Sequence, residues 1–193
     1  MKPPPYTYEY GANGRVMRLT DTILQRVTES EYDLAECPMR IRHRTANGTH
    51  LYTGEVTYNG YNELSAFREK VGAVESYETA FTYDNESKPT EITYGDTSHK
   101  VTYTYDAIGR TAERAVKNGT NTYTTGYTYA AGTNGGNTTG LIADISQPGE
   151  SCAYTYDNNG NILTAVRDDV TVRYTYDKLN PNTRCNCILP KKP

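Results

Sequence analysis

Residues 101–116 and 152–166 share one pattern of alternating residues. Each stretch opens on two tyrosines placed two apart, continues with an aspartate and, three residues later, a glycine, and ends on a run in which apolar and polar residues alternate. Alternation with a period of two predicts a β-strand, and an Asp-x-x-Gly segment between two such runs predicts a turn. Each stretch is therefore predicted to form an antiparallel β-hairpin.

The hairpin pattern recurs along the chain in about eight degenerate copies, 20 to 27 residues apart. This spacing suffices for two strands and two connections but is too short for a β-α-β unit. A helix stays an alternative for residues 61–79, where apolar residues also recur at helical spacing. Counted from the tyrosine before each turn, the copies are anchored at Tyr10, Tyr32, Tyr58, Tyr83, Tyr105, Tyr129, Tyr156 and Tyr176.

The aspartate of each copy is predicted to cap its turn, and the glycine to adopt the left-handed conformation that closes a type I turn with a bulge. Copies with Glu36 or Ser87 in place of the glycine are predicted to form turns of another type, because these residues adopt that conformation less readily. The predicted structural turn residues are Asp84, Asp106, Gly109, Asp157, Gly160 and Asp177.

Tyrosines two apart in a strand point to the same face, where their rings are predicted to stack across neighbouring strands. Such pairs could instead bind sugars, but cross-strand ladders explain them without a ligand. The predicted stacking aromatics are Tyr83, Tyr103, Tyr105, Tyr127, Tyr129, Tyr154, Tyr156, Tyr174 and Tyr176.

The composition fits a wide, thin sheet. The chain has 19 Tyr and 29 Thr among 193 residues and few large aliphatic side chains, so a conventional core cannot cover the sheet. A strip of some sixteen strands is predicted to curl, because twisted open sheets rarely exceed about 10 strands. We expect residues 1–180 to form this strip, and residues 181–193, where Pro, Cys and Lys replace the alternation, to be an irregular, possibly non-native tail.

Charge and hydropathy exclude two classes of partner. The formal net charge is −3 and the pI is 5.7, so no basic surface for nucleic acid is expected. No window approaches the roughly 18 apolar residues of a membrane-spanning helix. The first ten residues lack the apolar segment of a signal peptide, so if the protein is exported its signal lies outside this chain.

Candidate chemistry is sparse, and we expect no enzymatic activity, cofactor or metal. The histidines His43, His50 and His99 stand in no motif with a serine or cysteine nucleophile. Calcium at the turn aspartates is an alternative, but each turn offers one carboxylate rather than a cluster. Free thiols are expected, with a disulfide as the alternative and zinc disfavoured by the spacing, for Cys37, Cys152, Cys185 and Cys187.

The run of residues 39–44 places Arg40, Arg42 and Arg44 on one face of a strand. A solvated face explains these arginines. An acidic wall polymer or an anionic cargo is the alternative.

The units YTYDAIGRTAERAV and YTYDNNGNILTAVRDDVTVRYTYDKLN closely resemble the YD repeats of the Rhs family. That group includes bacterial wall-associated Rhs proteins, the shell-forming C component of insecticidal toxin complexes, and the teneurins. The resemblance covers residues 6–180 and implies hairpins that spiral into a hollow β-shell around a C-terminal effector, commonly a toxin. The family's Asp-Pro-rich self-cleavage motif has no counterpart, because the chain contains no Asp-Pro dipeptide, so no processing activity is assigned.

The resemblance implies a structural role in an extracellular or cell-surface bacterial protein. The expected partners are the remaining repeats or the effector domain of a longer Rhs-type polypeptide, and possibly a wall polymer. The alternative is a carbohydrate-binding module for wall attachment or adhesion that uses tyrosine platforms; it requires Tyr103, Tyr105, Tyr154 and Tyr156 to face solvent in a groove.

Overall fold

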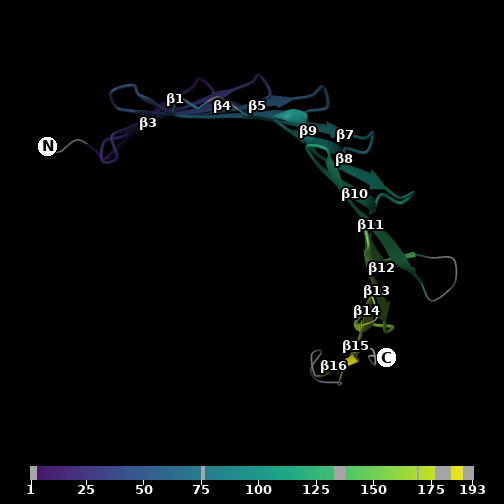
Figure 1. Ribbon diagram of the computed structural model, residues 1–193. Helices are drawn as coiled ribbons and strands as arrows, with labels where there is room; N and C mark the ends of the chain where they lie inside the picture. The colour runs from purple at the N-terminus through teal and green to yellow at the C-terminus, as the bar shows by residue number, and fades with distance from the viewer. Residues whose placement is uncertain (1–3, 75–76, 133–137, 169, 177–183, 189–193) are drawn as a thin grey trace. The chain divides into compact units, whose positions relative to one another are not determined.

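The computed structural model describes residues 4–74, 77–132, 138–168, 170–176 and 184–188, the last five by their backbone alone. Within these ranges the chain forms sixteen β-strands and no helix (Figure 1). The strands are β1 (Tyr6–Tyr10), β2 (Val16–Asp21), β3 (Arg26–Tyr32), β4 (Pro38–Thr45), β5 (His50–Tyr58), β6 (Leu64–Val71), β7 (Tyr77–Tyr83), β8 (Pro89–Tyr94), β9 (Asp96–Tyr105), β10 (Thr111–Asn118), β11 (Asn121–Ala131), β12 (Thr138–Gln147), β13 (Glu150–Tyr156), β14 (Ile162–Arg167), β15 (Val170–Thr175) and β16 (Arg184–Ile188).

The strands follow one another in the sheet in the order in which they occur in the chain. The pairings from β1 to β8 and from β10 to β16 are antiparallel. The chain divides into two compact units, residues 1–100 and 101–193, and each unit is an array of hairpins. The prediction of an all-β fold built from antiparallel hairpins is confirmed.

The described part of residues 61–79 forms strands over 64–71 and 77–79 and contains no helical residue, so the helical alternative is wrong. Strand β6 pairs with β5, where Val56 lies opposite Phe67, and with β7, where Phe67 lies opposite Thr79. The apolar spacing misleads because Phe67 and Val71 are an even number of residues apart, so they share a face of a strand as well as of a helix.

The sheet has almost no buried core. Among the described hydrophobic side chains the buried ones are Val27 and Val101, which are 7% and 6% exposed. Other apolar side chains lie opposite one another on neighbouring strands, as Val56 and Phe67 do, and such pairs contribute roughly 0.2–1 kcal/mol each, whereas some, such as Leu34 and Tyr61, are exposed. The stability of the strip therefore depends on contacts between adjacent hairpins, as in other repeat proteins.

Six hairpin turns share one backbone geometry. In the turn that follows Tyr156, the Gly160 amide donates to the Asp157 carbonyl at 3.0 Å, and the Asp157 amide donates to the Asn161 carbonyl at 2.9 Å. A β-bulge precedes the turns that follow Tyr10, Tyr32, Tyr58, Tyr83 and Tyr156, because the return strand skips one residue opposite the tyrosine. The same two hydrogen bonds close the turns that begin at Gly11, Asp33, Asn59, Asp84 and Asp106.

The residue that closes each of these turns has a positive φ. The angle is 82° at both Gly109 and Gly160. The prediction of a different turn type at Glu36 and Ser87 is wrong: φ is 66° and 63° there, and the same hydrogen bonds close both turns. The strand register on either side imposes the turn and outweighs the roughly 1–2 kcal/mol that a left-handed conformation costs a residue other than glycine.

The tail predicted to be irregular contains a strand. The backbone of Arg184–Ile188 forms β16, which pairs with β15 from Thr175↔Arg184 to Thr171↔Ile188. This pairing corrects the prediction for those five residues, because an edge strand with free backbone groups can pair with a segment that lacks the Tyr/Thr alternation. The domain division at residue 180 stays a prediction. None of the described residues belongs to a helix that could cross a membrane.

The turn geometry predicts opposite effects for two substitutions. A Cβ at Gly160 would lie 3.7 Å from the nearest Leu141 carbons, an ordinary contact, so the cost of Gly160→Val comes from the backbone and should lower the free energy of unfolding by about 1–3 kcal/mol. Ser87→Gly should raise it by about 0.5–1 kcal/mol. Urea denaturation measures both. The control Gly140→Val, at a glycine without positive φ and in open space, should not lower the free energy of unfolding in the same way. Equal decreases for the two valine variants would show that the positive φ at Gly160 is not the cause.

Candidate functional site: the tyrosine turns

The tyrosine before each turn is held by its hydroxyl as well as by its ring. In five described copies the hydroxyl donates a hydrogen bond to a backbone carbonyl of the preceding hairpin. The donor and acceptor pairs are Tyr58 with Pro38 (3.1 Å), Tyr83 with Leu64 (2.8 Å), Tyr129 with Thr111 (2.8 Å), Tyr156 with Ile142 (2.6 Å) and Tyr176 with Ile162 (2.7 Å).

The acceptor occupies an equivalent place in the preceding hairpin. Ile162, which accepts from Tyr176, is the residue that pairs with Tyr156 across the bulge. The acceptors of Tyr58, Tyr83 and Tyr156 are likewise opposite the preceding tyrosine of the series. Each of these tyrosines therefore ties its own hairpin to the one before it, and the bulge positions the carbonyl that receives the bond.

The predicted stacking tyrosines sit at the surface of the sheet but are not freely exposed. Burial raises the pKa of the Tyr83 and Tyr156 hydroxyls, so both stay protonated and can donate. Stacking of the nine rings across strands stays a prediction. Half-buried positions are occupied by Tyr83, Tyr103, Tyr105, Tyr127, Tyr129, Tyr154, Tyr156, Tyr174 and Tyr176.

An arginine directly after the turn glycine covers the next tyrosine in two copies. The guanidinium carbon of Arg110 lies 3.9 Å from the ring centroid of Tyr129, and that of Arg15 lies 5.1 Å from the ring centroid of Tyr32, which is within the range of a cation–π contact. Arg110 Nε also donates to Asp106 Oδ2 at 2.6 Å. Sequence reasoning missed this role, although the signal, a basic residue after the glycine, is present in both copies.

The side chain at the first turn position accepts hydrogen bonds from the turn backbone. Asp84 Oδ1 accepts from the amides of Glu86 at 2.8 Å and Lys88 at 3.0 Å, and the bond from Lys88 is the main cause that lowers the pKa of Asp84. Asn59 accepts the equivalent two bonds in its own turn. An uncharged acceptor therefore serves this position as well as a carboxylate does, and the turn that begins at Gly11 closes with neither. Asp84, Asp106 and Asp157 all supply an acceptor, whereas Asp177 lies outside the described residues.

The opposite face of β3–β7 carries a row of side chains with alternating charge. In the strand register Glu31, Arg40, Glu55, Arg68 and Glu78 lie side by side. Arg40 lies 2.8 Å from Glu31 and 2.7 Å from Glu55, and Arg68 pairs with Glu78. Exposed ion pairs contribute about 0–1 kcal/mol each, so the row specifies which residues lie opposite one another more than it stabilises the sheet.

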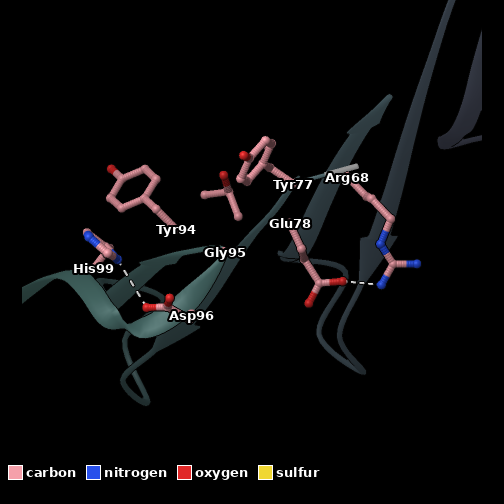
Figure 2. Close-up of a pocket in the computed structure, with 8 residues that line it drawn as sticks. Arg68, Tyr77, Glu78, Tyr94, Gly95, Asp96 and His99 are labelled. Atoms are coloured by element: carbon pink, nitrogen blue, oxygen red, sulfur yellow. Dashed lines mark hydrogen bonds and ion pairs between the residues drawn. The ribbon is translucent and has the colours of Figure 1, made fainter. Parts of the chain in front are cut away.

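An open concavity of about 1000 Å³ lies along β7 and β8 and the start of β9 (Figure 2). Two exposed rings line it, those of Tyr77 (74% exposed) and Tyr94 (49% exposed). Arg68 pairs with Glu78, and His99 is hydrogen-bonded to Asp96, as the dashed lines in Figure 2 show, so the concavity offers aromatic surface and hydrogen-bonding groups. Its lining residues are Arg68, Tyr77, Glu78, Thr79, Tyr94, Gly95, Asp96 and His99.

One corner of this concavity combines serine, histidine and aspartate without the geometry of a nucleophilic triad. His99 Nδ1 lies 3.0 Å from Ser98 Oγ and 3.1 Å from Asp96 Oδ1. A triad needs one ring nitrogen toward the serine and the other toward the carboxylate, whereas here a single nitrogen faces both. The hydrogen bonds from Ser98 and His99 lower the pKa of Asp96 to about 2. Among the residues whose placement is described, no group of three or more His, Cys, Asp or Glu side chains could hold a metal ion.

No family model matches the chain, and no curated protein sequence matches it. Among solved structures, the chain is similar to part of the Tc holotoxin pore of Photorhabdus luminescens, with 14% identity and a TM-score of 0.54 over 87% of this chain and 9% of that chain. This similarity shows a shared fold, and the chain spans less than a tenth of the similar structure's length. The TcdB2-TccC3-TEV structure (12% identity, TM-score 0.39, 91% of this chain and 12% of that one) and a porin-like protein from Bacteroides uniformis (14%, 0.38, 94% and 86%) are too dissimilar to carry an argument.

Removing one tyrosine hydroxyl should loosen one hairpin from its neighbour. Tyr156→Phe deletes the donor to Ile142 and leaves the ring, so the free energy of unfolding should fall by about 0.5–1.5 kcal/mol. The control Tyr123→Phe, at a ring that is 61% exposed, should leave it unchanged. Equal behaviour of the two variants in urea denaturation would show that the hydroxyl bond does not hold the hairpins together.

The turn aspartates should make the fold sensitive to acid. The pKa of Asp84 in the folded chain lies below its ordinary value of 3.8, so the ionised carboxylate stabilises the fold above that value, and this contribution is lost as the pH falls through the folded-state pKa. Asp84→Asn keeps the accepting oxygen but does not titrate, so its Tm should fall less steeply between about pH 4 and pH 2 than that of the parent chain. Asn59→Asp makes the reverse change in an equivalent turn, so the Tm of this variant should fall more steeply with pH than that of the parent chain. Identical dependence of Tm on pH in all three chains would show that the turn aspartates do not cause the acid sensitivity.

Proposed function

We propose that this chain is a structural repeat segment of an Rhs-type β-shell that encloses or displays a C-terminal effector or toxin. The observation that carries the proposal is the bond from a tyrosine hydroxyl to the preceding hairpin in five copies. Because the bond has the same kind of donor in these copies and an equivalent acceptor in four of them, a hairpin needs only its neighbour for support. Such a strip can extend by repetition and form a wide wall without a thick core.

The shared fold with part of the Tc holotoxin pore supports this proposal at the level of architecture. The expected partners are further YD repeats or the effector domain of a longer polypeptide, in a secreted or cell-surface bacterial protein. In this role the chain acts as a wall rather than as an enzyme.

A carbohydrate-binding module is the second candidate function. The four tyrosines on which it was predicted to depend, Tyr103, Tyr105, Tyr154 and Tyr156, are half-buried, which favours the wall. The specific observation in favour of sugar binding is instead the concavity of Figure 2, where two exposed rings, Tyr77 and Tyr94, stand beside paired polar groups.

Electron cryomicroscopy of the polypeptide expressed from the complete coding region that contains this chain tests the proposal. We expect β1–β16 to form part of a curved wall that bounds a cavity holding effector density. A chain that projects from the particle and bounds no cavity would overturn the shell assignment. In parallel, binding to purified wall glycan that is lost in the Tyr77→Ala, Tyr94→Ala double variant, with the fold retained, would establish the second candidate.

A further inference from the structure

A cluster of positive charge lies beside the alternating row on the same face of β3–β6. The next set of paired residues along these strands is Glu29, Arg42, Thr53 and Lys70, side by side in the register. Arg42 lies 3.0 Å from Glu31 of the alternating row. Lys70 is exposed and forms no ion pair with a described residue, so its charge is not compensated.

Arg44 adds a second incompletely used cation. Its Nε lies 3.6 Å from Glu29 Oε2, which is too far for a hydrogen bond. Among the described residues this Nε is the buried side-chain nitrogen that lacks a hydrogen-bond partner. The guanidinium is therefore held near Glu29 by charge but is not locked to it in the two-bond geometry that arginine and carboxylate favour.

His50 and Thr53 are hydrogen-bonded to each other beside these cations. His50 Nδ1 lies 3.0 Å from the Gly72 carbonyl, and Nε2 lies 2.8 Å from Thr53 Oγ1. A carbonyl can only accept, so Nδ1 donates to Gly72, and Nε2 shares the second hydrogen bond with the threonine hydroxyl. Both ring nitrogens are therefore engaged within the protein, and the cationic groups that remain are the arginines and Lys70.

These residues surround a concavity of about 380 Å³. Its lining contains four cationic side chains and one carboxylate, that of Glu55. The glutamates that pair with the lining arginines lie outside the concavity; they are Glu29, Glu31 and Glu78. Counting those outer glutamates and Arg40 as well, the face has five cations against four carboxylates, in a chain whose net charge is −3. The lining residues are Arg42, Arg44, His50, Thr53, Glu55, Arg68 and Lys70.

We propose that this concavity binds a single phosphate or sulfate group, with Lys70, Arg42 and Arg44 as the cationic ligands. Oxyanions of this class accept several charge-assisted hydrogen bonds at once, and arginine forks beside a lysine ammonium supply them. One oxyanion group suits the site, because the excess charge is confined to one end of these strands while the adjacent row is compensated. The inference goes beyond the proposed wall function and does not depend on it.

Nuclear magnetic resonance titration of the ¹⁵N-labelled chain with sodium phosphate, and separately with sodium sulfate, tests the site at an ionic strength held constant with sodium chloride. We expect saturable shifts at the amides of Arg42, Thr53 and Lys70. Lys70→Gln should weaken the affinity about tenfold, and Lys70→Arg should retain it. Arg173→Gln, which removes one positive charge from an exposed position on β15, serves as the matched control and should leave the affinity unchanged.

The site is supported if either oxyanion saturates the shifts and if Lys70→Gln, but not Arg173→Gln, weakens the affinity. The ratio of the two affinities then identifies phosphate or sulfate as the preferred group. Shifts no larger than those in chloride, or an equal loss in Arg173→Gln, would overturn the proposal and assign the effect to screening. The proposed wall function would be unaffected by that result, because it is tested by imaging of the full-length polypeptide.

Discussion

The hydrogen bond from a tyrosine hydroxyl to the carbonyl of the preceding hairpin is the interaction on which the rest of the structure depends. It joins a side chain of one repeat to a backbone carbonyl that lies at the bulge of the previous repeat. Among the described residues Val27 and Val101 are the buried hydrophobic side chains, so the sheet cannot rely on a shared interior. Its repeats are joined by backbone pairing between neighbouring strands and, in five copies, by this directional side-chain bond.

The turn residues explain the bulge in the same terms. An acceptor at the first position, which can be Asp84 or Asn59, gathers the turn amides, and a positive φ at the fourth brings the return strand back one residue out of phase. The following arginine, as in Arg110, then covers the ring of the next tyrosine. In the copy that contains Asp106, Gly109 and Arg110, the aspartate and the glycine shape the turn and the arginine covers the next tyrosine, whereas Glu36 and Ser87 show that the glycine can be replaced.

Sequence reasoning found the hairpins because a period of two and an Asp-x-x-Gly turn are local signals. It was wrong at Glu36 and Ser87, where strand pairing imposed a conformation that those residues disfavour. At residues 61–79 it favoured the hairpin but left a helix open, because one apolar spacing suits two structures. It could not find the hydroxyl acceptors or the alternating row from Glu31 to Glu78. Those contacts join residues 9 to 20 positions apart whose proximity depends on the register of several strands.

The sequential order of the strands also has a kinetic consequence. Because every strand pairs with its neighbours in the chain, contacts form over short sequence separations, and the entropy of closing each loop is small. A hairpin can dock as soon as it emerges from the ribosome, on a template that the previous hairpin has just completed. Synthesis and folding can then advance in the same direction and at the same pace, and the growing chain exposes a single unfinished edge at a time.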